Sequence, residues 1–189
     1  MKTATATRRN AFRALVSGAA LLAVLFTSGC NTASTQSNLT LFVENAPLPT
    51  LVARGGELTA AQAEARRHRG SFAVLGEGSS MEPVYVAGTA LVIRAGGYQT
   101  LRPGMPVVYA NTRGVSVAHM VVEQTNYGWV AVGLNNESHD SELVTADNLV
   151  GVITHAFASQ TGSLPQEVAA RMALNDQIRR GAKVASLGR

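Results

Sequence analysis

Residues 76–93 read GEGSSMEPVYVAGTALVI, a polar turn that leads from one apolar run into the next. Glycines beside a serine let the backbone approach a ligand closely, and Pro83 fixes the backbone where the chain leaves the turn. A serine hydroxyl is a poor nucleophile by itself and needs a base within hydrogen-bond reach. The stretch therefore predicts a binding or catalytic turn between two strands.

Short runs of β-branched and aliphatic residues continue on both sides of this turn. They alternate with Gly, Pro and Asn, a pattern typical of strands joined by hairpins. Turns are expected at residues 111–114 (NTRG) and 126–128 (NYG). The runs are FAVLG, ALVIR, PVVYA, VSVAHMVVE, GWVAVG and LVGVITHAF. The sequence therefore predicts a mainly β core over residues 71–158.

Helices are expected on either side of this core. Thr59 caps the helix-forming run AAQAEARRHR, which ends at Gly70, so residues 39–70 are interpreted as a lead-in strand followed by a short peripheral helix. Residues 159–189 contain SLPQEVAARMALNDQIRR, with Ser163 as a cap and apolar residues at helical spacing. They predict a longer C-terminal helix.

The first 29 residues have the pattern of an export signal. Four of the 16 basic residues (Lys2, Arg8, Arg9 and Arg13) precede the uncharged run ALVSGAALLAVLFT at residues 14–27, and the other 12 balance the 12 acidic residues. The rest of the chain is formally neutral, which argues against nucleic acid binding. A permanent anchor is the alternative, although a spanning helix needs roughly 20 apolar residues.

Cys30 is the only cysteine, and it directly follows the small pair Ser28 and Gly29. The segment LFTSGC resembles the lipidation signal of bacterial lipoproteins, which implies a lipid anchor on Cys30. Ordinary cleavage nearby, with Cys30 a bystander, is the alternative. The polar residues 30–38 are then interpreted as a tether. The expected location is the bacterial cell envelope, with the domain facing the periplasm or the cell exterior.

Histidine is the better candidate for the base that a serine nucleophile needs. Lys2 lies in the signal and Lys183 near the end of the terminal helix, so neither suits the β core. His119 lies in the strand VSVAHMVVE, where alternation places it on one face with Val115, Val117 and Val121. It is read either as a general base or as a core histidine that is bonded to a carbonyl.

Asp140 is the candidate for orienting that imidazole. It lies in the polar loop of GLNNESHDSELVTADNLVGVI, residues 133–153, and a carboxylate there could stabilise an imidazolium. The alternative is a surface Asx turn. His68 is expected to be solvated at a helix C-terminus, and His139 and His155 have no metal-ligand companions at useful spacing, so the sequence predicts no metal site.

The three blocks, in this order, resemble the core of the type I signal peptidase and LexA-like peptidase superfamily. The likeness covers roughly residues 71–155, and its most specific element is Ser-Met-x-Pro, matched by residues 80–83. The resemblance implies that Ser80, rather than Ser79, is the nucleophile. It places His119 at the base position of the histidine branch, Asp140 at the family aspartate and Ser138 at a supporting position.

The same resemblance implies a fold of coiled antiparallel sheets and a serine endopeptidase that uses neither a metal nor an organic cofactor. Its oxyanion hole would use the backbone N–H of Ser80 and groups near Gly78 and Ser79. The expected substrate is an exported polypeptide, which the lipid anchor would keep close to the membrane. Self-processing of the LexA-like kind is a further alternative, although the sequence has no DNA-reading domain ahead of the core.

Several positions depart from the family pattern. Thr89 replaces an acidic residue after Gly88, Met120 replaces a basic residue after the base, and Leu134 replaces an aspartate. Met105 and Pro106 also interrupt a Gly-Asp position. Because these changes surround the proposed trio, the alternative to an active peptidase is a catalytically weak or inactive peptidase-like lipoprotein that binds peptides.

Overall fold

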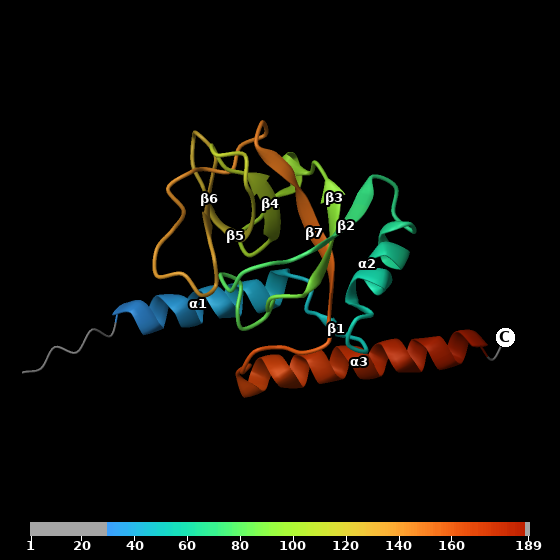
Figure 1. Ribbon diagram of the computed structural model, residues 1–189. Helices are drawn as coiled ribbons and strands as arrows, with labels where there is room; N and C mark the ends of the chain where they lie inside the picture. The colour runs from blue at the N-terminus through green and yellow to red at the C-terminus, as the bar shows by residue number, and fades with distance from the viewer. Residues whose placement is uncertain (1–29, 188–189) are drawn as a thin grey trace, which may run out of the picture.

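Residues 71–158 form six strands of one sheet, which confirms the mainly β core. The protein is described by a computed structural model over residues 30–187 (Figure 1). The sheet has seven strands in the order β2-β3-β7-β4-β5-β6, with β1 added beside β7. Only the β1–β7 pair is parallel in the described sheet. The strands are β1 (Thr50–Leu51), β2 (Ser71–Leu75), β3 (Ala90–Ala95), β4 (Pro106–Ala110), β5 (Ser116–Gln124), β6 (Trp129–Val132) and β7 (Leu149–Ala158).

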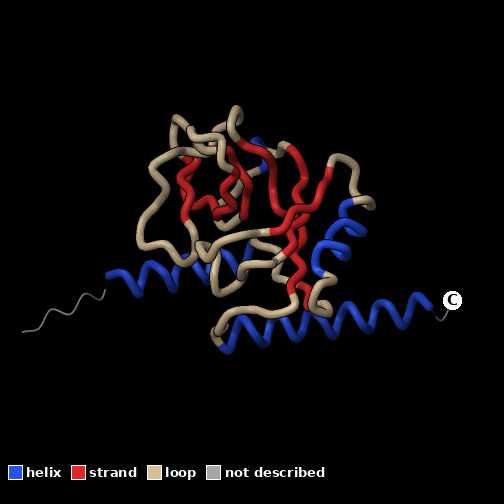
Figure 2. The backbone as a smooth tube through the Cα atoms, viewed as in Figure 1, coloured by secondary structure: helices blue, strands red, loops and turns tan. Residues whose placement is uncertain are grey.

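The long strand β7 joins two groups of strands. It pairs with β3 along one edge and with β4 along the other. Both ladders shift register, between Val92 and Ile93 and between Val108 and Tyr109, and such irregularities bend a sheet. Figure 2 shows β4–β6 gathered on one side of β7 and β2–β3 on the other. The expected turns at residues 111–114 and 126–128 connect β4 to β5 and β5 to β6.

The alternation of β5 divides its side chains between two apolar clusters. Met120 belongs to the larger cluster, with Val108, Val132 and Ile153. Val121 belongs to the second cluster, with Val107 and Trp129. Successive side chains of a strand point to opposite faces, so His119 lies on the face of the second cluster, with Val121 as expected.

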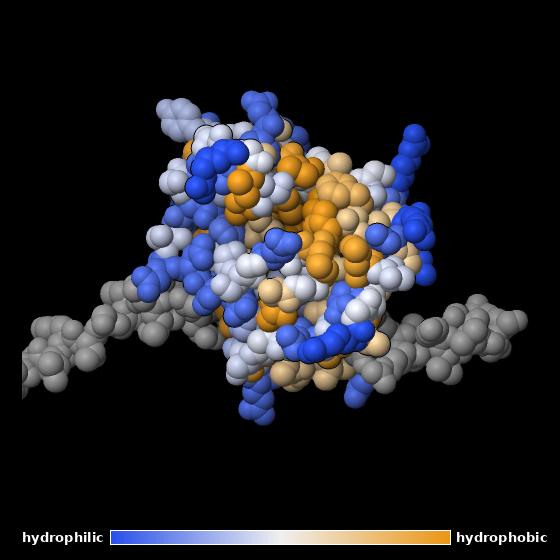
Figure 3. Space-filling model, viewed as in Figure 1, coloured by the Kyte–Doolittle hydropathy of each residue, from blue (hydrophilic) through white to orange (hydrophobic). Residues whose placement is uncertain are grey.

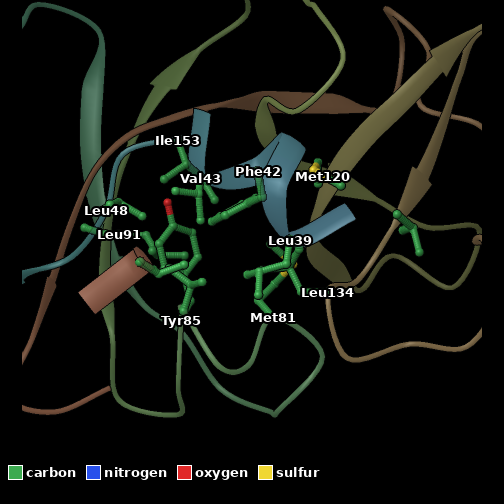
Figure 4. Packing of buried hydrophobic residues seen from close by; sticks show 14 of the residues in the cluster. Leu39, Phe42, Val43, Leu48, Met81, Tyr85, Leu91, Met120, Leu134 and Ile153 are labelled. Carbon is green, nitrogen blue, oxygen red and sulfur yellow. The ribbon is translucent and has the colours of Figure 1, made fainter. Parts of the chain in front are cut away.

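The structure has a helix where the polar tether and the first part of the lead-in segment were expected, and the lead-in strand is limited to β1. Residues 30–45 form the helix α1 (Cys30–Asn45). Leu39, Phe42 and Val43 follow helical spacing, are buried, and pack into the larger core cluster. The Phe42 and Tyr85 rings meet edge to face at 5.2 Å, as Figure 4 shows from close by. Packing of this apolar face on the core explains why the segment is helical, because its polar residues alone would not stabilise a helix.

Two further helices are close to expectation. The peripheral helix α2 (Glu57–Ala65) begins before Thr59, with Gly56 rather than Thr59 at its N-cap. The C-terminal helix α3 (Gln166–Leu187) follows Pro165, and a short 3-10 helix, η1 (Tyr98–Thr100), precedes β4. The predicted export signal at residues 1–29 lies outside the described residues. Among residues 30–187, no helix combines the length and apolar character needed to cross a membrane.

Candidate active site

The structure brings His119 and Asp140 into direct contact. His119 lies on β5 and is 6% exposed, and its Nδ1 lies 2.6 Å from Asp140 Oδ2. Asp140 lies in the loop after β6, where its backbone N–H donates to the Ala131 carbonyl at 2.8 Å. A proton on Nδ1 that is donated to the carboxylate leaves Nε2 with a lone pair. In this tautomer, Nε2 is the ring nitrogen that can accept a proton.

Tyr109 completes this arrangement and is a residue that sequence reasoning missed. Its hydroxyl donates to the same Asp140 Oδ2 at 2.7 Å. Tyr109 lies on β4, two positions after Val107, which pairs with His119, so both residues share that face. Burial raises the pKa of Tyr109 well above its ordinary value, with a smaller contribution from the bond to Asp140, and keeps the hydroxyl protonated as a donor. The one sequence signal was a hydroxyl in the apolar strand PVVYA.

The turn that carries Ser80 packs against the end of β6. The Ser80 carbonyl accepts a hydrogen bond from the Asn135 N–H at 2.8 Å. A Cβ atom added to Gly133 would lie 2.7 Å from that same oxygen and 2.8 Å from the Asn136 side chain. Glycine is therefore the residue that lets the serine turn approach this strand so closely.

The strand register relates this contact to the base. Met120 pairs with Val132, so continuing the antiparallel register places Gly133 beside His119. The backbone of Ser80 therefore lies against the residue opposite His119. Within residues 30–187, no hydrogen bond joins the Ser80 hydroxyl to the His119 ring, whose side-chain partner is Asp140.

A cavity of about 220 Å³ lies beside Ser80. Its walls come from the serine turn, from the start of β3, and from residues 116–118, which directly precede His119 on β5. Thr89 also lines this cavity; it is 1% exposed, and its hydroxyl has no hydrogen-bond partner in the described part of the chain. The threonine that departs from the family pattern thus contributes a buried, unsatisfied hydroxyl at this cavity.

Three of the remaining predicted site residues, Gly78, Ser79 and Ser138, lie at the surface. Gly78 has a φ of +88°, a conformation that favours glycine, and it is exposed in the serine turn. Ser79 is exposed, and its carbonyl accepts a 3.3 Å hydrogen bond from the Asn135 side chain. Ser138 is exposed in the loop before Asp140, without a hydrogen bond from its side chain among the described residues. Cys30 is the first residue of α1, and its lipidation stays a prediction.

A larger cavity of about 330 Å³ lies elsewhere, between the segment around β1 and helix α3. Its lining includes Leu48, Leu164 and Met172 but no residue of the serine turn or of β5. Size alone would favour this cavity as a binding site. Chemistry favours the smaller one, because only that cavity adjoins both a serine and the strand of the buried histidine. No protein-family model matches the sequence, and no curated protein matches it either.

Proposed function

We propose that this protein is a serine endopeptidase of the signal peptidase and LexA-like type, tethered to the membrane by a lipid on Cys30. The observation that carries the proposal is the part-buried His119–Asp140 pair at 2.6 Å, beside the turn that bears Ser80. A carboxylate-oriented imidazole next to a serine is the arrangement that general-base activation of a hydroxyl requires. The mainly antiparallel sheet is compatible with the fold that the motifs imply.

In the proposed reaction, His119 Nε2 takes the Ser80 proton as Oγ attacks the carbonyl carbon of the scissile peptide bond. The imidazolium, stabilised by Asp140, then donates that proton to the leaving amine nitrogen, and an acyl-enzyme remains. A water molecule that His119 deprotonates then attacks the carbonyl carbon of the acyl-enzyme. The imidazolium returns the proton to Ser80 Oγ, and the carboxylic acid product is released. General-base assistance of this kind is worth about 100- to 10,000-fold in rate.

The backbone N–H of Ser80 is the proposed donor to the oxyanion. Within residues 30–187, no backbone carbonyl accepts a hydrogen bond from it, so it can serve the substrate. The left-handed Gly78 shapes the turn just before it. Donors fixed in advance toward the developing charge stabilise the transition state without reorganisation.

Two features favour a polypeptide substrate. Strand β2 is at the edge of the sheet, and an extended chain can add to such an edge through main-chain hydrogen bonds. The chain continues from β2 directly into the cavity wall at Gly76 and Glu77, so a bound strand would lead toward Ser80. Phe72 and Leu75 on β2 are exposed. Figure 3 shows apolar surface across the middle of the side of the molecule in view. We propose exported polypeptides at the periplasmic or outer face of the envelope as the substrates.

The test is cleavage of peptides that carry small residues, followed by mass spectrometry, with Ser80→Ala compared against Ser163→Ala. Ser163 is an exposed serine before α3, outside the proposed site. Ser80→Ala should reduce cleavage to background while leaving peptide binding nearly unchanged, because the hydroxyl acts in the chemistry rather than in binding. Undiminished cleavage by Ser80→Ala would contradict the proposal.

A second candidate is a peptide-binding lipoprotein without peptidase activity. It is favoured by the lack of a hydrogen bond between Ser80 and His119 in the described chain, and by the unsatisfied Thr89 hydroxyl, which could bind a peptide group. Wild-type protein that binds such peptides but never cleaves them would establish this candidate. Cleavage by the wild type, measured beside binding of the same peptides, therefore decides between the two functions.

A further inference from the structure

Three side chains with metal-ligand atoms meet outside the proposed active site. Glu64 lies on α2, His68 lies just beyond its end, and His155 lies on β7. Glu64 Oε1 lies 3.0 Å from His68 Nε2 and 3.6 Å from His155 Nε2. One ligand atom from each residue lies within 4.8 Å of those from the other two. The cluster shares no residue with the serine, histidine and aspartate site.

These distances fit a tetrahedral metal ion. With metal–ligand bonds of about 2.1 Å, ligand atoms in a tetrahedral zinc site are about 3.4 Å apart. The Glu64–His68 and Glu64–His155 separations of 3.0 and 3.6 Å lie on either side of that value. The imidazole rings of His68 and His155 stack with centroids 5.3 Å apart, so both present their edges to the same carboxylate. Small side-chain rotations would therefore bring all three ligand atoms onto one ion.

Neighbouring groups favour the tautomer of His155 and the orientation of the Glu64 carboxylate that metal binding requires. The Thr154 hydroxyl donates to the Val92 carbonyl at 3.3 Å, and its oxygen lies 3.2 Å from His155 Nδ1. A proton on Nδ1 satisfies that contact and leaves the lone pair on Nε2, the atom that faces Glu64. Arg67 donates to Glu64 Oε2 at 2.7 Å, so Oε1 is the oxygen directed at the two imidazoles. Outer contacts of this kind orient the ligands in metal sites.

The position of the cluster gives an ion a structural role. Helix α2 packs on the sheet through Ala61 and Ala65 against Ala90 and Val92. Alanine side chains bury little apolar area, and the stabilisation scales with that area. An ion held by Glu64 and His68 on one side and His155 on the other would fasten α2 to β7. Figure 1 shows α2 beside the strands β2, β3 and β7.

We propose that Glu64, His68 and His155 bind a divalent transition-metal ion of the zinc type. Two imidazoles and a carboxylate form a donor set that zinc uses in proteins, with water at the fourth position. The His68 side chain is 49% exposed, so solvent reaches the site and can supply that water. Sequence spacing predicted no companion for His155, because its partners come from a distant helix that the fold brings to β7.

The test is titration of the chelator-treated full chain with Zn²⁺ by calorimetry, together with the melting temperature measured with and without Zn²⁺. His155→Gln and Glu64→Gln are compared with His139→Ala, which removes an exposed histidine outside the cluster. Loss of an outer contact alone weakens metal sites about 10- to 100-fold, so loss of a ligand should weaken Zn²⁺ binding at least about 100-fold. His139→Ala should bind as the wild type does.

The melting temperature separates metal binding from damage to the fold. Zn²⁺ should raise it for the wild type and for His139→Ala, and should leave it unchanged for the two glutamine variants. His68→Ala, at a half-exposed position, provides a ligand-loss variant with little effect on the core. Zn²⁺ binding that is absent from the wild type, or equal in the wild type and His155→Gln, would overturn the proposal. Loss of binding in His139→Ala alone would also overturn it.

Discussion

His119 Nδ1 lies 2.6 Å from Asp140 Oδ2, and the same carboxylate oxygen accepts the Tyr109 hydroxyl at 2.7 Å. Two donors on one oxygen hold the carboxylate in place, and the carboxylate in turn fixes the orientation of the imidazole. Three elements meet at this point: β4, β5 and the loop after β6. The two hydrogen bonds to Asp140 therefore depend on the pairing of β4, which carries Tyr109, with β5, which carries His119.

Asp140→Asn should reduce peptide cleavage about 100- to 10,000-fold, because an amide can present its N–H to Nδ1 and leave the proton on Nε2. The substitution preserves size, so the free energy of unfolding should change much less than the rate. Rates of peptide cleavage with saturating substrate provide the measurement. Tyr109→Phe is the companion variant and should lower kcat less, since it keeps the carboxylate. Equal rates for Asp140→Asn and the wild type would remove Asp140 from the mechanism.

Gly133→Ala should impair cleavage by displacing the serine turn. The new Cβ would lie 2.7 Å from the Ser80 carbonyl oxygen, so backbone has to move. Overpacking of this kind costs about 1–3 kcal/mol of unfolding free energy. Denaturant unfolding and cleavage rates measured on the same protein separate the two effects.

Gly114→Ala is the matched control for that displacement. Its φ of +74° makes alanine unfavourable, yet an added Cβ meets nothing within 4 Å. It should therefore lower stability while leaving cleavage unchanged at temperatures where the protein is folded. If Gly133→Ala and Gly114→Ala behaved alike in cleavage, the contact between Gly133 and Ser80 would have no part in the activity.

Sequence reasoning was most accurate where local pattern decides structure. Alternation in VSVAHMVVE predicted one face for His119 and three valines, and the structure has Val117 and Val121 in the same cluster. Val115 is the exception, because it precedes β5 and is 55% exposed. The turn glycines and asparagines also located the hairpins. Such features depend on neighbouring residues, which a single sequence displays directly.

Contacts between distant segments were harder to predict. The pairing of β4 with β5 decides that Tyr109 reaches Asp140, and no spacing along the chain expresses that register. The same holds for His155, which meets Glu64 and His68 only because α2 packs beside β7. Helix α1 was missed because its polar residues resemble a tether, whereas Leu39 and Phe42 are buried by tertiary packing.

Phe42→Ala should therefore lower the free energy of unfolding by about 3–5 kcal/mol, the usual cost of removing a buried phenylalanine side chain. Phe42 is 0% exposed and meets Tyr85 edge to face. Glu44→Ala, at an exposed position of the same helix, is the control and should stay within about 0.5 kcal/mol of the wild type. Chemical denaturation measures both. An unaltered stability in Phe42→Ala would show that α1 is not part of the folded core.

Thr89→Val should have opposite effects on stability and on peptide binding. The hydroxyl is buried at the cavity wall without a partner in the described chain, and an unsatisfied buried group costs about 1–3 kcal/mol. Valine nearly preserves the shape, so the free energy of unfolding should rise. If the hydroxyl meets its partner on a bound peptide, the same change should raise KM while leaving kcat nearly constant, because Thr89 acts in binding and not in proton transfer. An unchanged KM would mean that the peptide does not use this hydroxyl. The gain in stability would then be the only effect of Thr89→Val.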